Sequence, residues 1–407
     1  MKSSNNSGLH KFLSVIFIAV LLVFVVGFAS NGWEEDQGVP DSGEVGNTND
    51  ETDENKDGTD NTQTNTNNGN NQGDDNQEPP NENGGNSDLP PENNQNDNKE
   101  ENNPPEEIPE PPTVYINNMT GLVITEQQKN NVPLGFVFDP QAPLYGISSS
   151  EIAIEFPIED GTTRLLSYTT DDSALWKIGS FVETRAFISS MSHFFGGIIV
   201  SSGNDDVVPY NVWDTSALEL DLSKHYGAYH RENAKYVYSS YDKIGLALDA
   251  STGLLKETYK NAPFDFVSAG AVFGISDAKN VSIPYSEKSD TTFYYSEKNG
   301  TYLMYKSGSR KLDMLSGKNV SFKNVFVLFS DATTYEKASG TELVMDVMSG
   351  GRGYYVTNGT LTEITWALDE IGELNFYSLN GERLLVNQGN SYISYFKASE
   401  ATKVKIS

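Results

Sequence analysis

The stretch EFPIEDGTTRLLSY, residues 155–168, decides how the folded part of the chain begins. Apolar residues stand on both sides of Glu159-Asp160-Gly161, as expected where two strands meet at a tight turn. Asp is a common turn residue, and Gly161 can adopt the positive φ that many tight turns require. The stretch therefore predicts a β-hairpin with its turn at residues 159–161.

The charged residues of this hairpin admit two interpretations. Side chains alternate along a strand, so Glu155 should face away from Ile154 and Phe156. Glu155 and Arg164 could then form a cross-strand ion pair, which contributes roughly 0.2–1 kcal/mol when exposed. Alternatively, Glu155 and Glu159 could form an acid/base pair, because two carboxylates about 5–9.5 Å apart can hydrolyse a glycosidic bond. We favour the structural interpretation.

The N-terminal segment predicts export from the cytoplasm. Lys2 and Lys11 precede an apolar run from Phe12 to Phe28. This layout is typical of a secretory signal, and also of an uncleaved membrane anchor whose lysines stay inside. We keep both alternatives for residues 1–30. The chain has no cysteine, so it has neither disulfides nor the cysteine to which a lipoprotein's lipid is attached.

Residues 31–112 predict a disordered linker. They hold 23 Asp and Glu against Lys56 and Lys99, are rich in Asn, and end in a proline-rich stretch. Such a composition buries too little apolar surface to offset the entropy of ordering. The chain as a whole carries a formal charge of −29, which argues against nucleic acid as a partner.

Two motifs suggest metal sites, and both are incomplete. DENKDGTD, residues 53–60, matches the first half of a calcium loop, but Thr64 stands where the twelfth-position glutamate belongs. His225 and His230 are five residues apart, which does not place both on one face of a helix. We therefore expect no metal site and no cofactor.

From Val114 onward the pattern predicts two folded domains of an α+β protein. In residues 113–263, strand-like runs at 162–168 and 196–202 flank a helical spacing of apolar residues at 183–195. This order is typical of a βαβ unit and predicts an α/β domain. Residues 264–407 contain short strand-like runs separated by turn motifs such as KNGT and TNGT, which predict a mainly antiparallel β domain.

Several of these motifs together resemble the YerB-like bacterial lipoproteins, a family of unknown function. In the first domain they are KIGSFVETRAFI and GGIIVSSGND, and in the second VSIPYS and GGRGYYVTNGTLTEITW. The resemblance spans about residues 114–395. It implies two adjoining domains outside the cytoplasm, usually tethered to a membrane, with no established enzymatic activity. The positions that match the family's pattern include Glu155, Glu159, Gly161, Thr163, Arg164 and Arg185.

The chain also departs from that pattern. Val182 replaces a family arginine, and Ser201 stands at a family histidine. A Pro-His-Asn element falls near Ala234-Lys235-Tyr236 without its histidine or asparagine, and the lipid-bearing cysteine is missing. If the family's polar cluster is a site, about half of it is absent here, which favours a non-enzymatic member.

The sequence therefore predicts an envelope protein, secreted or anchored by its N-terminal segment, that acts as a binding or interaction module. The expected partners are peptidoglycan or another envelope protein. The candidate binding residues are Glu155, Glu159, Arg164 and Arg185. The alternative is an envelope hydrolase or transferase acting on wall polymer, with Glu155 or Glu159 as acid/base and Arg164 and Arg185 holding an anion.

Overall fold

The computed structural model describes residues 113–204, 218–233, 235–254, 264–274, 276–337, 340–370 and 372–407. The predicted signal or anchor, the linker and the calcium-like motif lie outside the described residues. Within them, no helix combines the length and the apolar character needed to cross a membrane.

The described residues form mostly β-sheet with few helices, and the largest sheet has 14 strands. Its strands run in the order β12-β22-β21-β18-β25-β4-β5-β3-β6-β10-β9, with β23 on β22, β7 on β3 and β8 on β7. In that order the bounds are β12 (Ser276–Asp277), β22 (Thr360–Leu368), β21 (Gly351–Thr357), β18 (Asn324–Ser330), β25 (Ser391–Lys397), β4 (Ile152–Pro157), β5 (Thr163–Thr169), β3 (Leu134–Phe138), β6 (Ile178–Phe181), β10 (Tyr236–Ser239), β9 (His230–Glu232), β23 (Leu374–Ser378), β7 (Ile198–Ser201) and β8 (Glu219–Asp221).

A second sheet of six strands packs beside it, and three strand pairs and several short helices complete the fold. The six strands are β16 (Ser309–Arg310), β15 (Thr301–Lys306), β14 (Ser289–Ser296), β13 (Asn280–Ser286), β26 (Lys405–Ile406) and β17 (Ser321–Phe322). The pairs are β1 (Tyr115–Ile116) with β2 (Val123–Ile124), β11 (Asp265–Val267) with β24 (Leu385–Asn387), and β19 (Ala332–Lys337) with β20 (Gly340–Met345). The helices are α2 (Glu126–Lys129), α3 (Ala186–Ser189), α4 (Met191–Phe195), α5 (Tyr241–Ala250), η1 (Ile147–Ser149), η3 (Leu222–Lys224) and η4 (Ala398–Lys403).

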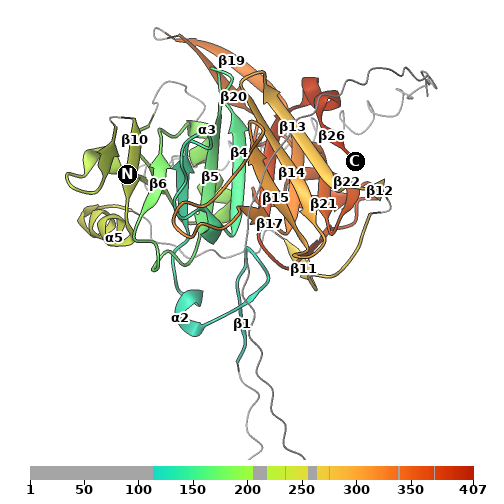
Figure 1. Cartoon of the computed structure of the whole chain (residues 1–407), viewed down its shortest axis with the longest axis horizontal. Helices are drawn as coiled ribbons and strands as arrows, with labels where there is room; N and C mark the ends of the chain where they lie inside the picture. Colours follow the sequence, from blue (N-terminus) through green and yellow to red (C-terminus); the bar gives the residue numbers. More distant parts are fainter. Residues whose placement is uncertain are drawn as a thin grey trace, which may run out of the picture. The chain divides into compact units, whose positions relative to one another are not determined.

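Strand β25 joins the two halves of the chain. It pairs in parallel with β18 on one side and with β4 on the other. Figure 1 shows the result, with β4 and β5 (green) lying directly beside the strands of the C-terminal half (orange to red). The large sheet therefore runs through both regions for which the sequence predicts separate domains. The boundary predicted after residue 263 adjoins residues outside the described part and stays a prediction.

The faces of β25 pack into two different cores. Tyr392 and Phe396 belong to the core shared with the six-stranded sheet, which includes Phe293. Ile393 and Tyr395 belong to a second core, in which α3 and α4 also bury their apolar side chains. This alternation explains why nearly all of β25 is buried.

The predicted N-terminal α/β domain is not confirmed. The helical spacing at 183–195 does give helices, but two short ones, α3 and α4, and the additional strand β6 precedes them. The strands on either side of this region, β5 and β7, are not neighbours in a βαβ unit. They flank β3, which is antiparallel to β5 and parallel to β7.

The predicted hairpin is confirmed. β4 and β5 pair antiparallel, Ile158 N–H donates to the Thr162 carbonyl at 3.0 Å, and Gly161 has a φ of +82°. The predicted ion pair between Glu155 and Arg164 is wrong. Arg164 lies opposite Phe156, while Glu155 lies opposite Leu165. Because directly opposite residues share a face, Glu155 and Arg164 point to opposite sides of the sheet.

Candidate functional site

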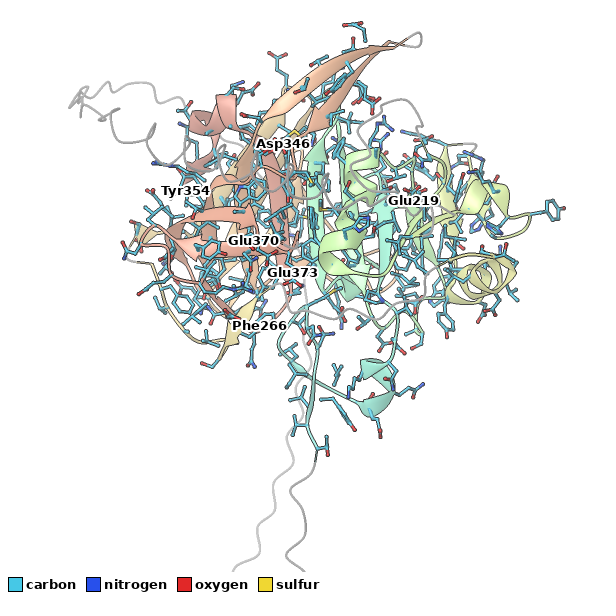
Figure 2. The ribbon with its side chains drawn as sticks, turned by 180° about the vertical axis from the view of Figure 1, so that it is seen from behind. Glu219, Phe266, Asp346, Tyr354, Glu370 and Glu373 are labelled. Atoms are coloured by element: carbon cyan, nitrogen blue, oxygen red, sulfur yellow. The ribbon has the colours of Figure 1, made fainter. Side chains whose placement is uncertain are left out.

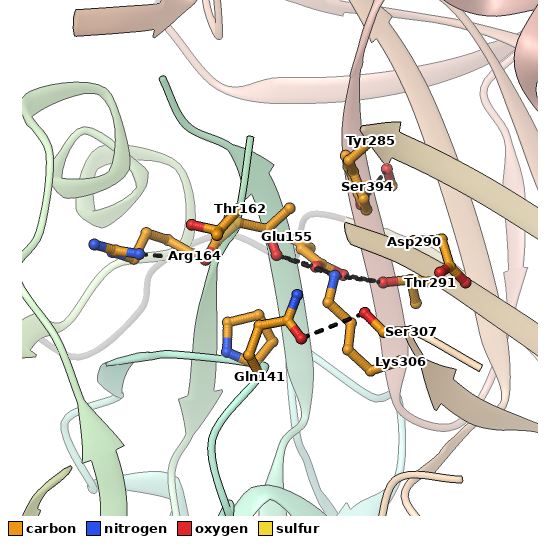
Figure 3. A network of polar contacts seen from close by, with 12 residues as sticks. Gln141, Glu155, Thr162, Arg164, Tyr285, Asp290, Thr291, Lys306, Ser307 and Ser394 are labelled. Atoms are coloured by element: carbon orange, nitrogen blue, oxygen red, sulfur yellow. Dashed lines mark hydrogen bonds and ion pairs between the residues drawn. The ribbon is translucent and has the colours of Figure 1, made fainter. Parts of the chain in front are cut away.

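Glu155 lies in a closed polar network between the two sheets. It is fully buried, and its carboxylate forms an ion pair with Lys306 of β15, whose side chain is only 2% exposed. Thr163 and Thr291 donate hydrogen bonds to it at 2.5 and 2.7 Å. Figure 3 shows Lys306 and Thr291 approaching Glu155 from the second sheet, while Arg164 points away. Glu155 is therefore not accessible to a ligand.

The buried network also contains tyrosines. Tyr392 of β25 donates to the second carboxylate oxygen of Glu155. Tyr285 of β13 contacts the Tyr392 hydroxyl at 3.2 Å and Ser394 at 2.6 Å. Burial, followed by the charge of Glu155, raises the pKa of Tyr285 and of Tyr392 well above 10. Both tyrosines therefore act as neutral hydrogen-bonding groups that help to connect the sheets.

The ionisation of Glu155 should make the stability of the protein depend on acid pH. Burial on its own would raise the pKa of Glu155, but the charge of Lys306 and the hydrogen bonds to the carboxylate outweigh it and lower the pKa below 4.5. A carboxylate with a lowered pKa in the folded state stabilises the fold above its unfolded pKa and loses this contribution as the pH falls. Chemical denaturation at pH 3 to 7 should therefore show the wild type losing stability below about pH 4.5 relative to a Glu155→Leu/Lys306→Met double variant. A difference between the two proteins that does not change with pH would contradict this assignment.

The other three candidate residues do come together, on the opposite face of the hairpin. Arg185, directly before α3, donates from Nη2 to Glu159 Oε1 at 2.7 Å, and its side chain is 6% exposed. Arg164 of β5 is close enough for the two positive charges to repel each other. We call Glu159, Arg164, Glu183 and Arg185 the arginine cluster.

Arg164 is held much less tightly than Arg185. Its nearest carboxylate is that of Glu183, at 3.7 Å from Nη2, and the Glu183 side chain is 56% exposed. Nη1 makes only a 3.5 Å contact with the Thr163 carbonyl, and the buried Nε has no hydrogen-bond partner in the described part of the chain. Burial and the charge of Arg185 lower the pKa of Arg164, although it stays a cation at neutral pH. A guanidinium in this state has hydrogen-bonding capacity left for an anion.

The positions that depart from the family pattern have local structural roles. Ser201, on β7, is buried and donates to the Gly203 carbonyl at 2.7 Å. Val182 is partly buried and packs against the core beneath α3 and α4. The two histidines of the incomplete metal motif also make local contacts: His225 contacts Ser251 at 3.3 Å, and the ring of His230 lies 5.7 Å from that of Tyr238.

Comparisons with known proteins fit this architecture. Residues 281–393 match the model for the C-terminal domain of DUF3048, a protein family of unknown function. Residues 281–393 therefore form a DUF3048 C-terminal domain. The matched segment contains the main strands of the six-stranded sheet and the beginning of β25, so it provides Lys306 and Tyr392 of the buried network.

The crystal structure of the YerB protein from Bacillus subtilis shares the fold. It superposes with a TM-score of 0.62 and 21% sequence identity, and the match covers 72% of this chain and 99% of that one. The predicted resemblance to YerB-like proteins is thus confirmed. No curated protein matches the chain.

Sequence reasoning missed Lys306, the partner of Glu155. One signal was present in the run TYLMYK, residues 301–306, where Lys306 has the same strand parity as Tyr302 and Met304. Those two side chains are buried, so a lysine on the same face must find a buried acceptor. The identity of that acceptor depends on packing between residues 151 positions apart.

Proposed function

We propose that this protein is an extracytoplasmic module of the cell envelope that binds, without turning over, an anionic group of peptidoglycan or of another envelope component. The observation that carries the proposal is the state of Arg164, a largely buried guanidinium with one loose ion pair and an unpartnered Nε. A carboxylate or phosphate is the acceptor that such a group binds best. Arg185, fixed by Glu159, adds positive charge beside it.

The location outside the cytoplasm is part of the same proposal. It is supported by the apolar run between Phe12 and Phe28 and by the acidic linker that follows, which suits a spacer between a membrane and a folded domain. The segment either remains as an anchor or is removed on secretion. The strongly negative charge of the chain argues against nucleic acid as a partner.

Binding to wall polymer provides the test. The wild-type chain and an Arg164→Gln variant would be sedimented with purified peptidoglycan, one sample carrying its anionic polymers and one stripped of them. We expect Arg164→Gln to weaken binding about 10- to 100-fold, because a charge-assisted hydrogen bond contributes about 1.5–3 kcal/mol. Arg310→Gln is the matched control, since Arg310 is exposed and contacts Tyr305 on the second sheet. Equal sedimentation of wild type and Arg164→Gln would contradict the proposal, and the two polymer samples separate a wall carboxylate from a phosphate.

The alternative of a wall hydrolase or transferase makes a different prediction. Its acid/base would be Glu159, because Glu155 is enclosed by Lys306, Thr163, Thr291 and Tyr392. Under that alternative Glu159→Gln would abolish turnover of wall polymer. Under our proposal neither the wild type nor the variant releases soluble fragments, as measured by chromatography of the supernatant.

A further inference from the structure

A separate cavity of about 500 Å³ with both polar and apolar walls lies beside the β1–β2 segment. Its walls come from the β1–β2 segment, from η1 and the residue before β4, from the start of β15, and from the turns that precede β18 and β25. Figures 1 and 2 show the β1–β2 segment with α2 extending below the sheets, and Figure 2 labels Phe266, against which the turn at Gly121 packs. None of the four predicted site residues lines this cavity.

Polar groups in the cavity wall have hydrogen-bonding capacity that the fold does not use. The carboxyl of Glu151 accepts from Asn117 at 2.8 Å and from Thr170 at 2.5 Å, both through Oε1. Its Oε2 is buried and has no partner among the described residues. The hydroxyls of Ser148 and Thr301, which also line the cavity, make no hydrogen bond within the described part of the chain.

The backbone holds Glu151 in a fixed position. Its N–H donates to the Tyr168 carbonyl at 2.8 Å, and its carbonyl accepts from Ser391 N–H at 2.9 Å. Burial, the largest effect, raises the pKa of Glu151 above 4.5 although the hydrogen bonds from Thr170 and Asn117 lower it. A carboxyl in this environment favours hydroxyl partners, which can accept its proton or donate to its oxygen, as pH requires.

One side of the cavity is apolar and exposed. Leu122 and Val123 are 48% and 70% exposed, and both line the cavity with Ile124. The lining also includes the amides of Gln388 and Asn390, which donate to the Gly121 and Ser321 carbonyls, and the ammonium of Lys323. Lys323 donates to the Gly300 carbonyl at 3.1 Å and to Asn358, which leaves one of its three N–H groups for a ligand. Sugar rings combine an aliphatic face with a rim of hydroxyls, and this wall matches both.

We propose that this cavity is a second binding site, and that it takes a pyranose unit of a glycan chain. The ring's aliphatic face would lie on Leu122 and Val123, and its hydroxyls would bond to Glu151, Ser148 and Thr301. This site shares no residue with the arginine cluster and binds a different chemical group. Either binding proposal can therefore be contradicted by experiment without affecting the other.

Isothermal titration of the full chain, kept in a detergent without sugar headgroups, tests the proposal. The probes are glucose, N-acetylglucosamine and the β-1,4-linked trimer of N-acetylglucosamine. We expect saturable binding of at least one probe with a dissociation constant on the order of 100 µM, and roughly tenfold weaker binding in Glu151→Gln and in Thr301→Val. Because Glu151 also bonds to Asn117 and Thr170, the Thr301→Val and Ser148→Ala variants give a readout if Glu151→Gln fails to fold.

Arg310→Gln is the control, because Arg310 is exposed and lies outside both sites, and it should bind the sugar probes as the wild type does. Absence of saturable binding to all three probes would overturn the proposal. So would affinities that are the same in the wild type, Thr301→Val and Ser148→Ala. Loss of sugar binding in Arg164→Gln would place the sugar at the arginine cluster and would overturn it as well.

Discussion

Replacing Lys306 with methionine should destabilise the protein by about 3–5 kcal/mol. The substitution keeps an unbranched side chain only one atom shorter but leaves the Glu155 carboxylate fully buried without its cation. A buried charge without a partner either costs several kcal/mol of desolvation or forces the carboxyl to take up a proton. The free energy of unfolding in urea at pH 7, measured on the full chain, gives the size of the effect.

Two controls make this result specific. Lys298→Met removes an exposed lysine from the turn between β14 and β15 and should change the stability by less than about 0.5 kcal/mol. The double variant Glu155→Leu/Lys306→Met should recover much of the loss, because an apolar pair no longer carries a buried charge. A loss below about 1 kcal/mol in Lys306→Met alone would mean that the pair is not the main connection between the sheets.

Local sequence signals predicted the hairpin but not its partners. The turn residues and Gly161 determine where the chain reverses, and alternation correctly places Glu155 on the face opposite Ile154 and Phe156. Which residue lies opposite Arg164 depends on the register of β4 against β5. The turn residues did not determine this register to within one position. One position is enough to move a side chain to the other face of the sheet.

The long-range arrangement could not be predicted from local pattern. β25 is the last long strand of the chain, yet it lies between β18 and β4 in the large sheet. Parallel insertion of this kind depends on which apolar faces remain uncovered after the other strands have paired, and no local motif encodes it. The arginine cluster shows the same limit, because the hairpin sequence itself made Arg164 a candidate, whereas Arg185 entered the candidate set only through the family resemblance. Their proximity follows from α3 starting beside the hairpin.

The second large effect is expected just before strand β7. Gly197→Ala should destabilise the protein by more than about 3 kcal/mol. Gly197 lies between α4 and β7 with a φ of +79°, and a Cβ there would stand 2.0 Å from the Pro133 carbonyl oxygen. That oxygen accepts the Ile198 N–H at 2.9 Å, the bond with which β7 begins to pair with β3. Alanine therefore adds about 1–2 kcal/mol of backbone strain and also displaces the start of a buried strand.

Two other glycines separate these contributions. Gly253 has a similar φ of +87° with open space around it, so Gly253→Ala should cost only the backbone strain of about 1–2 kcal/mol. Gly245 lies within α5 and also has open space, so Gly245→Ala should stabilise the protein by about 0.5–1 kcal/mol. In urea denaturation, Gly197→Ala should lower the free energy of unfolding most and Gly253→Ala less, while Gly245→Ala should raise it. If Gly197→Ala costs no more than Gly253→Ala, then β7 tolerates displacement from Pro133, and the parallel pairing of β7 with β3 does not depend on this close approach.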